Sequence, residues 1–130
     1  MLPVITSESE PELFAKLVAG AHEFDTGRYW HAHEEWEEGW RAYTAPDRDF
    51  CKGLIQFTVI QHHLNRGAPS AARALLVRGR VPVLLDIPSA GRWPVLVPEI
   101  LAVHAAQLAV FEQGGEPAVT SLKIGPMLAV

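Results

Sequence analysis

His33 and Glu37 are the residues of this chain whose types and spacing most directly suggest chemistry. They lie in the run 29–41, Tyr-Trp-His-Ala-His-Glu-Glu-Trp-Glu-Glu-Gly-Trp-Arg. If this run is helical, the two side chains are four residues apart and stack on one face. A neutral imidazole beside a carboxylate can hold a divalent metal, exchange a proton, or form a hydrogen bond. The spacing therefore indicates where chemistry could occur and leaves all three kinds of chemistry open.

The aromatic residues around this pair predict which side of the helix is buried. On a wheel of about 100° per residue, one arc of the helix is mainly aromatic, and His33 lies on it. Glu37 lies at the edge of the arc, with Arg41 four residues on and able to pair with it. The arc consists of Tyr29, His33, Trp36, Trp40 and Tyr43. We therefore expect His33 on the buried side, whereas Glu35 and Glu38 face water.

A second set of polar residues lies in the segment 47–65, which also has helical periodicity. Gln56 and His63 fall in the middle of an otherwise apolar arc, and Gly53 on the same arc would allow a close helix contact. A buried amide or imidazole without a partner costs about 1–3 kcal/mol, so we expect partners. The opposite arc, expected to be the wet face, contains Thr58, Gln61, His62 and Asn65.

The two helices are joined by a short turn and should pack antiparallel, which would bring His33 and Glu37 against Gln56 and His63. Two imidazoles and a carboxylate match the ligand set of many catalytic zinc and iron sites. In a metal-assisted enzyme, His33, Glu37 and His63 would hold the ion and Gln56 would orient a ligand or water. The walls of that site would be Trp30, Trp36 and Trp40, with Arg41 paired to Glu37.

The alternative hypothesis is a buried hydrogen-bond network without metal. In that case the chain is a non-catalytic helical module, and the same polar residues fix the helix register. Such a module could be a monomer or a homodimer. The sequence names no substrate, so the partner is either an unidentified small molecule or none.

Length and composition predict one all-helical domain. A chain of 130 residues with 48% hydrophobic and 20% charged residues can form one core. Periodicity and helix-terminating signals predict about five helices in a compact bundle over residues 1–115, followed by an extended apolar tail over 116–130. Gly27 and Gly67 are the expected terminators of the first and third helices, and Pro82 should end or bend the fourth. The tail could pack on another surface, such as a partner chain.

Charge is distributed unevenly along the chain. Residues 1–49 carry 11 acidic and 4 basic side chains, whereas residues 50–92 carry 6 basic and 1 acidic. The basic stretch either complements the acidic half, within a monomer or across a dimer, or faces an anionic ligand. The net charge of −4 argues against a nucleic-acid binder. No segment is long and apolar enough for a membrane span, and a cytoplasmic protein is expected.

The residues quoted so far also form a known pattern. The motif His33-x-x-x-Glu37-x-x-Trp40, followed by 52–56 (Lys-Gly-Leu-Ile-Gln) and 61–67 (Gln-His-His-Leu-Asn-Arg-Gly), resembles the domain-of-unknown-function family 309. This group of small bacterial and archaeal proteins has no established reaction. The resemblance implies a compact all-helical domain and a metal-binding role for His33 and Glu37. It also places Gln56 and His63 at the family's second polar block.

Overall fold

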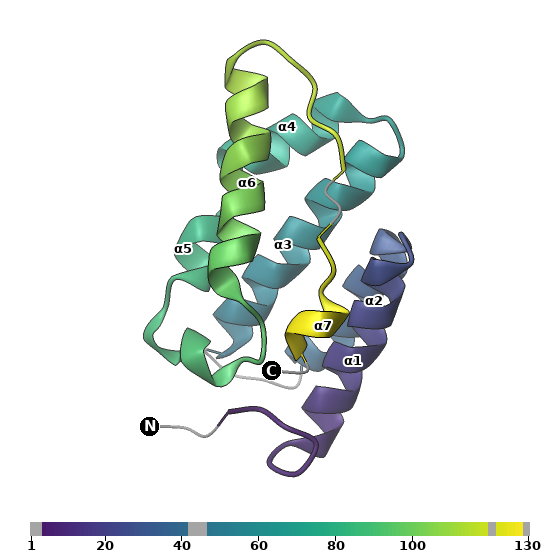
Figure 1. Cartoon of the computed structure of the whole chain (residues 1–130), viewed down its shortest axis with the longest axis vertical. Helices are drawn as coiled ribbons and strands as arrows, with labels where there is room; N and C mark the ends of the chain where they lie inside the picture. The colour runs from purple at the N-terminus through teal and green to yellow at the C-terminus, as the bar shows by residue number, and fades with distance from the viewer. Residues whose placement is uncertain (1–3, 42–46, 120–121, 129–130) are drawn as a thin grey trace.

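The expected all-helical architecture is confirmed in a computed structural model, which describes residues 4–41, 47–119 and 122–128. Within these ranges there is no β-strand, and the five longer helices match the predicted ones (Figure 1). Two short helices and a 3-10 helix lie between or after them. In chain order the elements are α1 (Pro11–Asp25), α2 (Tyr29–Arg41), α3 (Asp47–Asn65), α4 (Pro69–Arg78), α5 (Val81–Leu85), η1 (Pro88–Arg92), α6 (Val97–Glu112) and α7 (Gly125–Leu128).

The predicted terminators are confirmed and make the first connections tight. Gly27 and Gly67 follow α1 and α3 with φ of 81° and 72°, the left-handed conformation that favours glycine. Pro82 lies in the first turn of α5, where its missing N–H costs nothing, so a new helix begins there. None of the helices in the described ranges is long and apolar enough to cross a membrane.

The helix α3 runs through the centre of the molecule and carries much of the core (Figure 1). Leu54, Phe57 and Ile60 on α3 are fully buried. The α1–α2 pair packs on one side of α3, and α4, α5 and α6 lie on the other. The predicted close approach at Gly53 is confirmed, because a Cβ there would lie 2.9 Å from atoms of Leu84 and Leu85 in α5.

The C-terminal tail differs from the expected extended segment. Residues 115–119 are irregular, but the chain then folds back along the molecule and ends in α7, against α1 (Figure 1). Ile124, Met127 and Leu128 are buried there, so this apolar segment packs on its own chain. The physical reason is that Asp25, at the end of α1, accepts hydrogen bonds from the backbone amides of Ile124 and Gly125, at 2.7 and 2.8 Å.

Replacing Asp25 with alanine should therefore release the tail. Two backbone donors at the start of α7 would lose their acceptor, which costs about 1–2 kcal/mol at a helix N-terminus. We expect a lower free energy of unfolding in urea and faster amide hydrogen exchange over residues 122–128. Asp25→Asn retains one acceptor oxygen and should be intermediate. Unchanged exchange in Asp25→Ala would show that the carboxylate does not hold the tail.

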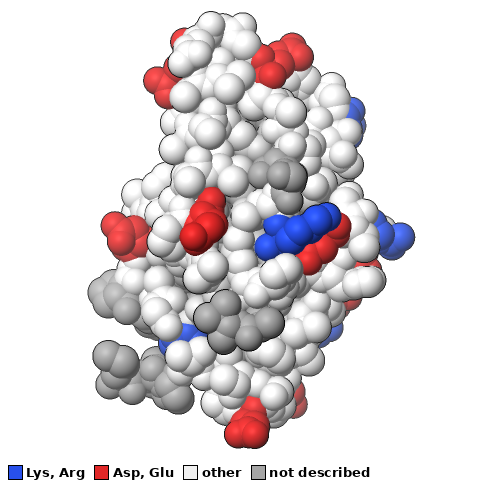
Figure 2. Space-filling model, in the orientation of Figure 1, with Lys and Arg blue, Asp and Glu red and all other residues white. Residues whose placement is uncertain are grey.

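Charged side chains are sparse on the face shown in Figure 2, where acidic groups form isolated spots on a mostly uncharged surface. Among the basic residues of 50–92, Arg92 is largely buried and pairs with Glu10. The acidic residues Glu35 and Glu38 of α2, which were expected to face water, both contact Lys16 of α1. The acidic half is thus partly neutralised by its own Lys16 and partly by Arg92 of the basic stretch.

Candidate functional site

The orientation of α2 is set by Trp36, which is 1% exposed and packs against α1. Its indole Nε1 donates a hydrogen bond to the carbonyl oxygen of Leu17 at 3.2 Å. The close packing is possible because Gly20 has no side chain, since a Cβ there would lie 2.5 Å from Cδ1 of Trp36 and nearer still to Nε1 and Cε2. With Trp36 turned into the core, His33 and Glu37 lie on the flank of α2 that borders α3 and solvent.

The predicted pairings of Glu37 with His33 and Arg41 are confirmed. His33 Nε2 lies 2.8 Å from Glu37 Oε2, and an Arg41 Nη atom donates to Glu37 Oε1 at 3.2 Å. The other ring nitrogen of His33, Nδ1, lies 3.3 Å from the carbonyl oxygen of Trp30. Each of these four atoms thus has a polar atom within hydrogen-bond distance, although a neutral His33 can donate to only one of its two acceptors. The side chains of His33 and Glu37 are 15% and 33% exposed, so this network is half-buried and not interior.

His62 of α3 lies next to this network, where its ring contacts Trp30. The Trp30 ring has its centroid 4.5 Å from that of His33 and 5.0 Å from that of His62. Trp30 is nevertheless 46% exposed. The Trp30 indole is thus held between the imidazoles of His33 and His62, and about half of it faces solvent. It is a fixed aromatic group on the surface and does not form the wall of a closed site.

The imidazoles of α3 are biased towards the neutral form. Burial lowers the pKa of His62, and the nearby His63, Arg66 and His33 lower it further. Burial also lowers the pKa of His63, with Arg66 as the second cause. The His63 Nδ1 atom is buried and has no hydrogen-bond partner among the described residues. Two imidazoles with available lone pairs therefore lie at the C-terminal end of α3.

The predicted exposure of the α3 side chains was only partly correct, because α3 packs against α2 on one side and against α4 and α5 on the other. Gln56 lies elsewhere, where its side-chain oxygen accepts a hydrogen bond from the backbone amide of Arg80 at 2.8 Å. Thr58 and Gln61, expected on the wet face, are fully buried. Gln56 and His63, expected to be buried, are half-buried.

The three tryptophans were expected to wall the site, and two of them were placed wrongly. Trp36 belongs to the α1–α2 core, and Trp30 lies at the surface. The side chain of Trp40 lies outside the described residues. The site is therefore a half-buried surface on α2 and the end of α3.

Sequence reasoning missed two features. His62 was set aside as a solvated neighbour, although it contacts Trp30 directly. Gln61 was taken as solvent-facing, although it and Gln107 of α6 form a reciprocal pair of amide hydrogen bonds, each 2.9 Å long. Its partner is 46 residues away along the chain. Only a pairing of helical patterns from α3 and α6 could have pointed to it.

In the part of the chain that the structure describes, no group of three or more histidine, cysteine, aspartate or glutamate side chains is placed to hold a metal ion. The His33 nitrogen that would bind a metal instead lies within hydrogen-bond distance of Glu37. A metal at His33 and Glu37 would first have to separate this pair.

Acid should destabilise the fold through its buried histidines. His104 of α6 is 3% exposed, its Nε2 has no partner among the described residues, and burial lowers its pKa, as it does for His62 and His63. Because the unfolded chain binds these protons near pH 6.5 and the folded chain does so only at lower pH, stability is retained above about pH 6.5 and falls below it. Urea midpoints between pH 5 and pH 8 would measure this. His104→Leu should make the loss of stability below pH 6.5 less steep. If the variant and the natural chain lost stability equally with falling pH, His104 would not be a cause of the acid sensitivity.

The comparisons with known proteins give a family but no function. No curated protein and no solved structure matches this chain. One family model matches, that of a domain of unknown function, and it covers residues 17–75. This stretch runs from the middle of α1 into α4 and includes the α2 network and His62. We therefore assign residues 17–75 of this chain to the domain of unknown function family 309 (DUF309).

Proposed function

We propose that this chain is a non-catalytic helical interaction module that binds a second copy of itself through the Trp30 surface. This surface consists of Trp30, His31, Glu34, His62 and Arg66. The observation that carries the proposal is the half-exposed Trp30 ring, which is held in place by His33 and His62. Tryptophan is enriched among residues that dominate interface energies, and a fixed ring loses little conformational freedom on binding.

The neighbouring network supports a positioning role for the motif residues. Both oxygens of Glu37 and both nitrogens of His33 have a polar atom of α2 within hydrogen-bond distance. The His33 ring also lies against one side of Trp30, with the two ring centroids 4.5 Å apart. His33 and Glu37 thus maintain the shape of the surface on which Trp30 is presented.

Charges around Trp30 favour a second copy as the partner. Glu34 is exposed and lies 3.6 Å from the imidazole of His31. Arg66 is also exposed, and it is close enough to His62 to lower the pKa of that imidazole. A two-fold contact places each patch opposite itself, so the acidic side of one copy can meet the basic side of the other. The Trp30 surface carries acidic and basic side chains beside a central aromatic ring, so two copies of it can be complementary in charge.

Sedimentation velocity over a micromolar concentration series tests the proposal. We expect the sedimenting mass to rise from one chain to two. A single-chain mass throughout would overturn the proposal.

The motif residue Glu37 has a separate expected effect. Glu37→Gln should lower the free energy of unfolding by about 0.5–1 kcal/mol, since it weakens two half-exposed charged contacts. Glu34→Gln, a matched change on a more exposed carboxylate, should have a smaller effect. Equal effects of the two variants in urea would show that the network contributes nothing special.

Metal binding by His33, Glu37 and His63 is the second candidate function, and the unpartnered Nδ1 of His63 favours it. A zinc- or iron-class ion would require the His33–Glu37 contact to open. Elemental analysis of untagged protein distinguishes the two functions. Stoichiometric metal that is lost in His33→Ala would support the metal site, whereas substoichiometric metal that this variant leaves unchanged would exclude it.

A further inference from the structure

We infer that the outer face of α4 binds a small organic anion that carries two anionic groups. The face, called here the α4 groove, lines a hollow of about 410 Å³. Its lining residues recur at helical spacing and so lie on one side of α4. They are Ser70, Arg73, Ala74, Val77 and Arg78. This groove shares no residue with the Trp30 surface, so the two proposals stand or fall separately.

The two arginines of the groove are available to a ligand. Both are exposed, and neither forms an ion pair with any residue that the structure describes. The sequence of α4 contains no acidic residue, and Arg92 is the member of the basic stretch that pairs with the acidic half, through Glu10. A planar guanidinium binds a carboxylate or phosphate through two parallel hydrogen bonds. Two such unpaired groups on one helix face favour an anion.

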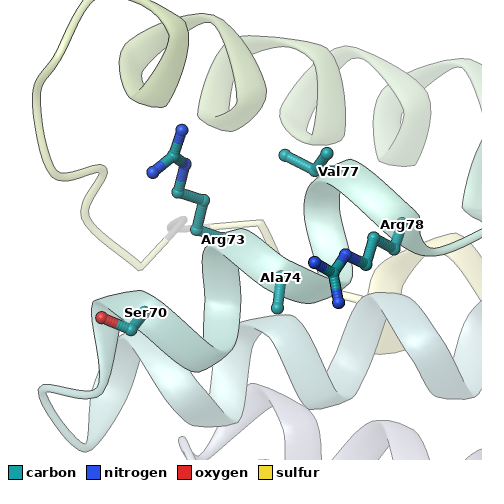
Figure 3. A pocket seen from close by; sticks show the side chains of 5 residues that line it. All are labelled: Ser70, Arg73, Ala74, Val77 and Arg78. Atoms are coloured by element: carbon teal, nitrogen blue, oxygen red, sulfur yellow. The ribbon is translucent and has the colours of Figure 1, made fainter.

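The shape of the groove specifies the ligand further. Arg73 and Arg78 are five residues apart, which corresponds to about 7.5 Å along the helix axis. Figure 3 shows their guanidinium groups at separate points, with the methyl groups of Ala74 and Val77 beside them. Val77 is 59% exposed, so its methyl groups are accessible to a ligand. The arrangement fits an apolar body with an anionic group at each end.

One acidic residue limits where the ligand can lie. A second hollow of about 290 Å³ adjoins the groove and shares Ser70 and Arg73 with it. That hollow extends to Phe111 in the last turn of α6 and to Glu116 beyond it. The Glu116 carboxylate would repel an anion there. The ligand is therefore placed along α4 between Arg73 and Arg78, with the Ser70 hydroxyl as a further donor.

Isothermal titration calorimetry at constant ionic strength tests the inference with three probes: inorganic phosphate, pyrophosphate and the dicarboxylate suberate. The test variant is Arg73→Gln/Arg78→Gln. The matched control, Lys52→Gln/Arg80→Gln, removes the same charge from exposed residues outside the groove. We expect suberate to bind once per chain, and more tightly than inorganic phosphate. The test variant should lose at least about tenfold in affinity, while the control retains it.

The outcomes separate the possible occupants. Binding of suberate assigns a ligand with an apolar body and two carboxylates, whereas binding of pyrophosphate alone would contradict the apolar body and overturn the inference. The inference is overturned if no probe binds, or if both variants lose affinity equally, since that would reflect overall charge. The inference is also overturned if the test variant abolishes self-association in sedimentation. In that case the α4 groove would bind an acidic segment of a second copy and not a small anion. Circular dichroism of both variants checks that they remain folded.

Discussion

Replacing Gly20 with alanine should lower the free energy of unfolding by about 3 kcal/mol. The added Cβ would overlap the indole of Trp36, which is fixed by its hydrogen bond to Leu17. Alanine gains about 1 kcal/mol over glycine in a helix, so the clash exceeds the gain in propensity. Urea denaturation measures the difference.

Gly39→Ala is the matched control for this prediction, because Gly39 lies in α2 at the same α1–α2 contact. There a Cβ would lie 3.5 Å from Leu13 Cδ1 and 3.6 Å from Lys16 Cβ, which is ordinary packing distance. This variant should be as stable as the natural chain or more stable by up to about 1 kcal/mol. If Gly20→Ala were equally neutral, Trp36 would not be seated against α1. The orientation of α2, and with it the exposure of Trp30, would then be wrong.

Replacing Trp30 with alanine should weaken self-association about 30-fold or more, the largest functional effect expected. Truncating a tryptophan at the centre of an interface costs about 2 kcal/mol or more, which corresponds to that factor in Kd. Because about half of the ring is already exposed, stability should fall by less than about 1 kcal/mol. Sedimentation equilibrium gives the dimer constant, and urea denaturation gives the stability.

The control for this prediction is Val83→Ala, which truncates an exposed apolar side chain on α5, far from α2 in sequence. It should leave the dimer constant unchanged. A dimer constant that is the same in Trp30→Ala and in the natural chain would contradict the role of the Trp30 surface. A loss of structure in Trp30→Ala would show up separately as a lower urea midpoint.

The fold could be predicted because its signals are local. Helical spacing of apolar residues, together with Gly27 and Gly67 at helix ends, predicted the positions of α1, α2 and α3. The pairs His33–Glu37 and Glu37–Arg41 also depend on local spacing and were predicted correctly. The short α7 depends on Asp25, about 100 residues earlier in the chain, and no local pattern indicates that contact.

The site could be predicted only in part, because polarity does not determine exposure. Thr58 is buried with its hydroxyl donating to the carbonyl oxygen of Leu54 four residues earlier, at 2.8 Å. Gln61 is buried because Gln107 satisfies its amide. Both are therefore buried on the arc of α3 that was expected to face water. Trp30 was expected to wall an interior site because it is large and aromatic. It lies in the first turn of α2, where it remains half-exposed.

Cross-linking at the Trp30 surface tests the proposed function most directly. Cys51 is buried, and burial raises its pKa to about 12, so an introduced cysteine would be the reactive thiol. We expect His31→Cys, next to Trp30, to yield covalent dimers with a bis-maleimide linker. Lys52→Cys is the control, because residue 52 is exposed and about 15 Å along α3 from His62. Dimers from position 31 and none from position 52 are expected. Dimers from position 52 alone, or from neither position, would contradict a contact through Trp30.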